Sequence, residues 1–314
     1  GYVRQAYLDG LGMSEEGRGN PYKFGMVGAS DTHTGAISDD ESNFTSKIGI
    51  FDGTPEGRGS APLTGENLEL VLQAPIRQLT LKKIGDRYFN NAVFNQWGAS
   101  GLAAVWAEEN TRNSIFEAFR RKETYATSGT RIKLRFFAGY DLDKSLLDAD
   151  DVIKQAYKKG VPMGQDLETS DGSKPSFLIW ALRDKNSAPL QRVQIIKGWV
   201  DRVTGKPHEE VIDVLCSDGL MPDPETNRCP DNGALVDISD CSISSDVGAN
   251  ELKTVWTDKS FDPSVKAFYY VRVLENPTCR WSTWDAIKTG NEPREDLKKT
   301  IQERAWSSPI WYSY

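Results

Sequence analysis

The chain has 314 residues and a formal net charge of −7, from 38 Lys and Arg against 45 Asp and Glu. Its 38% hydrophobic share, which includes 9 Trp, argues against intrinsic disorder, because disordered chains carry too little apolar surface to fold. The acidic balance argues against nucleic acid as a partner. No apolar run approaches the roughly 18 residues of a membrane span, so we expect a soluble chain of about two domains.

The first 130 residues predict a mixed α/β portion. Apolar residues at helical spacing predict a helix over 2–16. The apolar run 24–29 predicts a buried strand of a parallel sheet. A long polar loop follows over 29–64, and further helices are expected over 65–73 and 111–122.

The pattern changes after Gly129, where β-branched and aromatic residues alternate with turn residues. We therefore divide the chain into 1–130 and 131–314, and expect the second part to be a mostly antiparallel, sandwich-like β-domain. A helical insert is expected around 144–158. The predicted strands cover 132–136, 176–182, 192–200, 211–215 and 267–274.

Four cysteines lie in the last hundred residues, and none forms the CxxC pair of a structural zinc site. We expect disulfides, which imply an oxidising compartment, over reduced buried thiols. Of the three possible pairings, we favour Cys216 with Cys229 and Cys241 with Cys279. Because the chain begins at Gly1 without an initiator Met or a signal peptide, we also expect a processed chain or a fragment.

The strongest chemical signal is the segment 28–35, directly after the apolar run. In parallel α/β folds, active sites collect at the carboxyl ends of strands. If the backbone stays extended, Asp31 and His33 point to one side. They could then ligate zinc or manganese, or act as a general-base pair; the alternative is a capping Asp beside a surface His. Ser30 lacks the Gly-x-Ser-x-Gly context of a nucleophile.

Two other polar clusters are weaker candidates. Before the helix at 111, two adjacent carboxylates can accept hydrogen bonds from the free backbone N–H groups of the helix N-terminus. The alternative is that Glu109, Asn110 and Arg112 hold substrate. The acidic loop 218–231 offers oxygen ligands for calcium, but it lacks the EF-hand pattern. We favour an ordinary disulfide-tied loop there.

The chain resembles the domain of unknown function 3604 family of the PHP (polymerase and histidinol phosphatase) superfamily, whose relatives include carbaryl-hydrolase-like metallohydrolases. The motif Ser30-Asp31-Thr32-His33 resembles the last metal-ligand motif of that superfamily. The other matching blocks are 20–25, 105–112, 121–129, 161–164, 194–199, 302–306 and 311–312.

The resemblance implies the end portion of a distorted (β/α)7 barrel followed by a β-rich accessory domain. It makes Asp31 and His33 catalytic ligands of a di- or trinuclear metal site. Family members carry further His and acidic ligands in an N-terminal half, which would be this chain's partner. Without it the chain is expected to be nearly inactive. The implied substrate is a phosphoester, amide, ester or carbamate, and the implied location is periplasmic or secreted.

The competing hypothesis is a non-catalytic, extracellular binding or structural module in which the metal site is vestigial. A row of exposed indoles would favour this module, whereas indoles in the core would weaken it. A large apolar face on residues 1–130 would instead favour a missing half. The tryptophans concerned are Trp180, Trp199, Trp256, Trp281, Trp284, Trp306 and Trp311.

Overall fold

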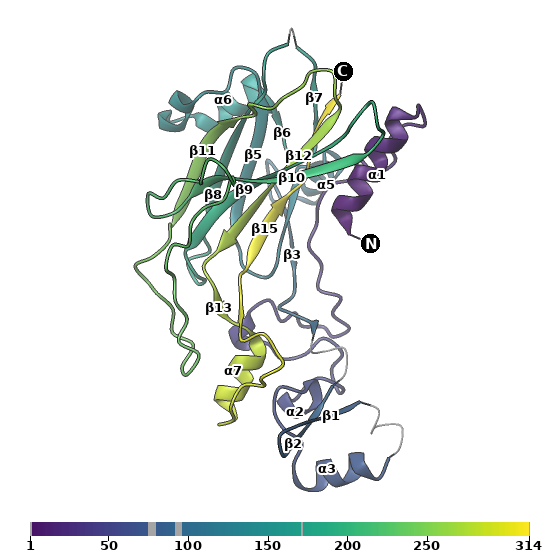
Figure 1. Ribbon diagram of the computed structural model, residues 1–314, viewed down its shortest axis with the longest axis vertical. Helices are drawn as coiled ribbons and strands as arrows, with labels where there is room; N and C mark the ends of the chain where they lie inside the picture. Colours follow the sequence, from purple (N-terminus) through teal and green to yellow (C-terminus); the bar gives the residue numbers. More distant parts are fainter. Residues whose placement is uncertain (1, 75–79, 92–95, 171, 314) are drawn as a thin grey trace.

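A computed structural model describes residues 2–74, 80–91, 96–170 and 172–313 (Figure 1). Two antiparallel sheets pack face to face at one end of the molecule, and a smaller group of helices and short strands lies at the other end. None of the described helices is both long and apolar enough to cross a membrane.

The larger sheet has the order β10-β9-β12-β15-β4-β3, and β16 joins β12 to β7. Its described pairs are antiparallel except β16 with β7. Its strands are β3 (Leu102–Val105), β4 (Thr124–Thr127), β7 (Asp166–Glu168), β9 (Leu190–Val200), β10 (Pro207–Cys216), β12 (Ala267–Glu275), β15 (Arg304–Ser307) and β16 (Ile310–Ser313).

The smaller sheet has the order β11-β8-β5-β6 and is antiparallel throughout. Its strands are β5 (Lys133–Gly139), β6 (Val161–Pro162), β8 (Ser176–Leu182) and β11 (Glu251–Thr257). Alternate residues of the two sheets face each other and form the main core. The fully buried members include Leu134, Phe136, Phe177, Ile179, Val193, Ile195, Tyr269 and Val271.

Helices cover the outer faces of both sheets. Helix α1 (Val3–Glu15) packs Tyr7, Leu8 and Leu11 against the larger sheet. The 3-10 helix η3 (Lys144–Asp148) and α6 (Val152–Lys159) cover part of the smaller one. Helix α5 (Arg112–Arg120) follows β3, and Thr111 caps it by accepting a hydrogen bond from the Ser114 N–H at 3.3 Å.

The second group of elements is built mainly from residues 36–91 and from the C-terminal part of the chain (Figure 1). Here η1 and α2 contact α7, so segments far apart in the sequence lie together. The elements are η1 (Glu41–Asn43), α2 (Pro55–Arg58), α3 (Gly65–Leu72), β1 (Leu81–Ile84), β2 (Arg87–Asn90), β13 (Thr278–Cys279), α7 (Trp281–Lys288) and β14 (Thr300–Ile301).

The predicted strand over residues 24–29 is wrong. The segment has no strand pairing in the structure, and it is half-buried or exposed. Side-chain hydroxyls hold it in place of a backbone ladder: the Met26 N–H donates to Ser308 Oγ at 2.7 Å, and the Met26 carbonyl accepts from Thr124 Oγ1 at 2.8 Å. Gly28 lies against β3, where a Cβ atom would come within 2.4 Å of the Leu102 carbonyl oxygen.

The expected barrel portion is not found among the described residues, whereas the mostly antiparallel β-structure is confirmed. The boundary at residue 130 does not separate the strands. Strands β3 and β4 precede it, yet β4 pairs with β15 in the same sheet as β9, β10 and β12.

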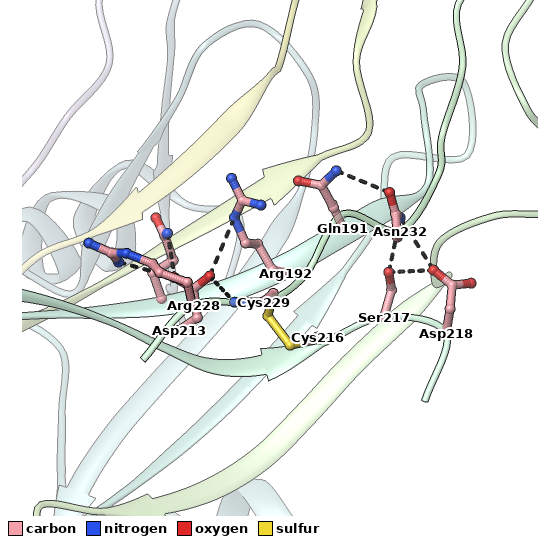
Figure 2. The surroundings of a disulfide bond; sticks show 10 residues. Gln191, Arg192, Asp213, Cys216, Ser217, Asp218, Arg228, Cys229 and Asn232 are labelled. Atoms are coloured by element: carbon pink, nitrogen blue, oxygen red, sulfur yellow. Dashed lines mark hydrogen bonds and ion pairs between the residues drawn. A yellow bond between two sulfur atoms is a disulfide. The ribbon is translucent and has the colours of Figure 1, made fainter. Parts of the chain in front are cut away.

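Two disulfides are present, as the cysteine count predicts: Cys216–Cys229 and Cys241–Cys279. Figure 2 shows the first of them beside a buried carboxylate. Asp213 accepts a hydrogen bond from the Cys229 N–H at 2.8 Å and pairs with Arg228 at 3.4 Å. The disulfide and this carboxylate together fix the long loop after β10 onto the edge of the larger sheet.

Candidate functional site

Asp31 and His33 lie on an exposed turn beside the start of β3. Asp31 has a φ of 52°, in the left-handed region, so the expected extended backbone is wrong at this position. The turn is held from two sides. The His33 N–H donates to the Lys47 carbonyl at 2.7 Å, and His33 Nδ1 lies 2.9 Å from the Asp31 carbonyl oxygen.

This geometry fixes the tautomer of the His33 ring. A carbonyl oxygen only accepts hydrogen bonds, so in the neutral ring the proton sits on Nδ1 and the lone pair on Nε2. A metal-ligating histidine commonly donates its other ring N–H to a carbonyl or carboxylate, which orients the ring. His33 Nε2 is thus an oriented donor, and the Asp31 carboxylate is exposed two residues before it.

The described residues do not complete a metal site around these two donors. No group of three or more His, Cys, Asp or Glu side chains suited to a metal ion occurs among them. A nearby charged group is the Lys47 ammonium, which interacts electrostatically with Asp31. Burial lowers the pKa of Lys47, while the carboxylates of Asp31, Glu41 and Asp52 oppose that shift.

Lys47 is a residue that sequence analysis missed, because it lies inside a polar loop with no recognisable motif. Its backbone position is set by Asp52, which is fully buried. The Asp52 carboxylate accepts hydrogen bonds from the N–H groups of Lys47 and Ile48, at 2.7 and 2.9 Å, and from Ser46 Oγ at 2.6 Å. This loop therefore holds the carbonyl that orients His33.

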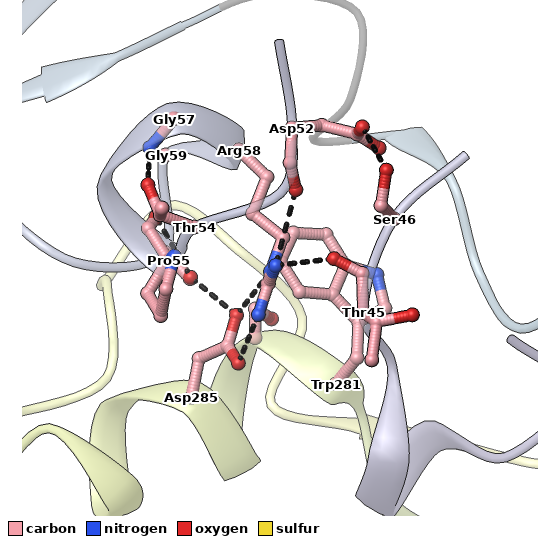
Figure 3. A network of polar contacts seen from close by, with 12 residues as sticks. Thr45, Ser46, Asp52, Thr54, Pro55, Gly57, Arg58, Gly59, Trp281 and Asp285 are labelled. Atoms are coloured by element: carbon pink, nitrogen blue, oxygen red, sulfur yellow. Dashed lines mark hydrogen bonds and ion pairs between the residues drawn. The ribbon is translucent and has the colours of Figure 1, made fainter. Parts of the chain in front are cut away.

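A buried ion pair anchors the same loop to α7 (Figure 3). Arg58 donates from Nε and Nη2 to both carboxylate oxygens of Asp285, each at 2.7 Å. Its Nη1 donates to the backbone carbonyls of Thr45 and Asp52, at 2.6 and 3.1 Å. The guanidinium also lies 5.8 Å from the Trp281 ring centroid. One side chain thus joins the loop, α2 and the C-terminal part of the chain.

The predicted substrate-binding residues Glu109, Asn110 and Arg112 are not brought together with Asp31 and His33. All three are exposed and follow the far end of β3. The segment at Gly28 and Ala29 lies against the beginning of β3, where a Cβ on Gly28 or Gly101 would meet the neighbouring backbone. At about 3.3 Å per residue, the four-residue strand β3 places about 13 Å between the two sets.

The acidic loop forms hydrogen-bonded turns. Asp223 accepts from the N–H groups of Glu225 and Thr226, at 3.0 and 2.8 Å, and Asn232 Nδ2 donates to Asn276 at 2.9 Å and to Ser217 at 3.2 Å. These side chains stabilise the loop itself, which fits the ordinary structural role.

A polar cavity of about 470 Å³ opens where η1 meets the end of the sandwich. Its lining includes two buried carboxyl groups, Glu41 and Glu303. Burial raises the pKa of Glu303 to about 8, and the nearby Glu41 adds to the shift. Burial also raises the pKa of Glu275, beside this cavity, to about 7. Hydrogen bonds from Ser128 to Glu303 and from Ser187 to Glu275 stabilise these groups.

The family described as protein of unknown function (DUF3604) matches residues 1–314. The chain belongs to this family. No curated protein and no solved structure matches the chain. The description of the family names no activity, so the function is inferred from the residues of the site.

The Arg58–Asp285 pair predicts a large stability effect. Arg58→Met leaves a buried carboxylate without its partner, so we expect the free energy of unfolding in urea to fall by ~3–5 kcal/mol. Lys82→Gln is the matched control, since the Lys82–Asp296 pair is partly exposed and should contribute at most about 1 kcal/mol. Equal effects of the two substitutions would contradict the anchoring role.

The raised carboxyl pKa values predict a pH dependence. Between about pH 4.5 and 8 the folded chain holds protons at Glu303 and Glu275 that the unfolded chain releases, so stability falls as pH rises. Glu303→Gln keeps a hydrogen-bond acceptor for Ser128 and removes the titration. We expect it to raise the free energy of unfolding at pH 9 by ~1–3 kcal/mol, with little change at pH 5. Parallel pH profiles of wild type and variant would contradict the assignment.

Proposed function

We propose that this chain contributes Asp31 and His33 to the zinc or manganese site of a metal-dependent hydrolase, whose other ligands come from an N-terminal part of the same protein. The observation that carries the proposal is the hydrogen bond from His33 Nδ1 to the Asp31 carbonyl. In the neutral ring it leaves an oriented lone pair on Nε2, and His33 and Asp31 are both exposed. A coincidental surface histidine would not need this second interaction.

The distribution of exposed apolar side chains supports the packing of another part of the protein against this chain. A contact with another protein part is favoured when it removes exposed apolar side chains from water. Among the described residues, most such side chains precede residue 130, and Ile50 and Phe51 are 93% and 67% exposed. The full set there is Tyr2, Val3, Tyr22, Phe24, Val27, Ile37, Ile50, Phe51, Leu70, Leu72, Phe116 and Phe119.

The chemistry proposed for the complete protein is hydrolysis of a small ester, amide, carbamate or phosphoester. A bound divalent metal lowers the pKa of a water molecule and polarises the bond to be cleaved. Within this chain, Asp31 offers a carboxylate and His33 an imidazole nitrogen as ligands. The Asp31 carbonyl contacts the imidazole at Nδ1, and the Lys47 carbonyl accepts a hydrogen bond from the His33 backbone N–H.

The binding-module alternative predicts a row of exposed indoles in the β-rich part. None of the seven tryptophans considered there is exposed, and Trp281 and Trp311 are fully buried. The hydrolase proposal is therefore the better supported one. The two disulfides support a periplasmic or secreted location for it.

Metal titration tests the proposed donors without requiring activity. We expect the chain to bind Zn²⁺ weakly in isothermal titration calorimetry, because affinity depends on the number of ligands. His33→Gln and Asp31→Asn should each weaken binding by about tenfold or more.

The chain contains its own control for this measurement. His208 is the second of only two histidines; it is exposed and stacks on Trp199. His208→Gln should leave Zn²⁺ binding unchanged. If the His208 variant loses binding while the His33 variant keeps it, Asp31 and His33 are not the metal donors.

A further inference from the structure

A second candidate site lies on the outer face of the smaller sheet, on strands β5 and β8. Lys133 pairs with Leu182 across the two strands, and Arg135 pairs with Trp180. All four side chains point away from the main core, because residues alternate along a strand and Leu134, between the two cations, is fully buried on the inner face. The four residues form the floor of a cavity of about 260 Å³.

This part of the sheet is left uncovered by the helices. η3 and α6 pack on Phe137, Leu178 and Val255, farther along the same face. The cavity begins where that cover ends, with Ile153 of α6 on one side and Trp106, after β3, on the other. We call this cavity the indole groove, since Trp106 and Trp180 both line it.

Both indole N–H groups of the groove already have partners. Trp106 Nε1 donates to the Leu134 carbonyl at 2.7 Å, and Trp180 Nε1 donates to Glu251 at 2.6 Å. The rings therefore offer the groove apolar surface and no unsatisfied donor. Ile153 and Leu182 add aliphatic surface, so a bound molecule would meet mainly carbon atoms.

The charged groups that line the groove are cationic. They are Lys133, which is exposed, and Arg135, whose guanidinium lies 3.4 Å from the centroid of the Trp106 ring. Arg135 also donates to the Tyr157 hydroxyl at 3.0 Å and lies 3.5 Å from the buried Glu123, in an adjoining cavity. These contacts hold the guanidinium in position, while Lys133 supplies positive charge at the rim.

We propose that the indole groove binds a small aromatic carboxylate, with its ring against Trp180 and Ile153 and its carboxylate at Lys133 and Arg135. The flat apolar walls match an aromatic ring, and the two cations match an anion. A sugar would need hydroxyl, amide or carboxylate side chains as partners, and the described lining of this groove provides none. The site is independent of the proposed metal site, from which β3 separates it.

Isothermal titration calorimetry with 2-naphthoate tests the proposal, with 2-naphthalenemethanol as a neutral ligand of similar shape. We expect saturable naphthoate binding and weaker binding of the alcohol. Lys133→Glu reverses one rim charge at an exposed position, so it should weaken naphthoate binding by about fivefold and leave the alcohol unaffected. Lys206→Glu, at an exposed lysine before β10, is the matched control.

A second pair of variants tests the ring contact. Trp180→Ala removes one wall and should weaken both ligands by about tenfold, whereas Trp199→Ala, at a half-buried indole of the other sheet, should not. Far-ultraviolet circular dichroism checks that both variants are folded. Absence of saturable naphthoate binding by the wild-type chain, or equal affinity of wild type, Lys133→Glu and Trp180→Ala, would overturn the proposal.

Discussion

The buried contact between Arg58 and Asp285 joins two residues that are 227 positions apart. A buried guanidinium needs a partner for its charge and acceptors for its N–H groups. Asp285 and the backbone carbonyls of Thr45 and Asp52 supply both. The loop that carries Lys47 is consequently fixed to α7. Since the Lys47 carbonyl accepts a hydrogen bond from the His33 backbone N–H, this ion pair helps to fix the backbone of the turn that carries the candidate metal donor.

Buried polar groups also fix other loops of the molecule. In these loops, a buried carboxylate accepts hydrogen bonds from backbone N–H groups that are not part of a sheet. Asp52 accepts hydrogen bonds from two consecutive backbone N–H groups of its loop. Asp213 ties the Cys216–Cys229 loop to β9 through Gln194, which donates to it at 2.6 Å. A carboxylate that accepts several hydrogen bonds stays satisfied when buried. These networks give fixed shapes to long segments with little regular secondary structure.

Local sequence patterns predicted the elements whose residues alternate or recur at a fixed period. The helix over 2–16 and the strands over 176–182 and 192–200 correspond to α1, β8 and β9. The segment 24–29 has the composition of a buried strand, but hydroxyl groups from distant residues satisfy its backbone. The short strands β3, β4 and β15 were missed, because their pairing depends on long-range register that no local pattern contains.

For the candidate site, the assignment of Asp31 and His33 as metal donors stays a prediction, and the extended backbone expected there is wrong. The left-handed turn at Asp31 directs the ring of His33 toward a backbone carbonyl, and nothing in the spacing predicts this. Neither Lys47 nor Arg58 belongs to a recognisable sequence motif. Their roles follow only from contacts between distant segments.

The most direct test of the account is the protonation state of the His33 ring, observed by nitrogen-15 nuclear magnetic resonance on histidine-labelled protein. The chain has two histidines, so His208→Gln assigns both rings. The account predicts that the neutral form of the His33 ring is protonated at Nδ1, and that its Nε2 resonance shifts when Zn²⁺ is added. A neutral form protonated at Nε2, or an Nε2 resonance that does not respond to Zn²⁺, would contradict it.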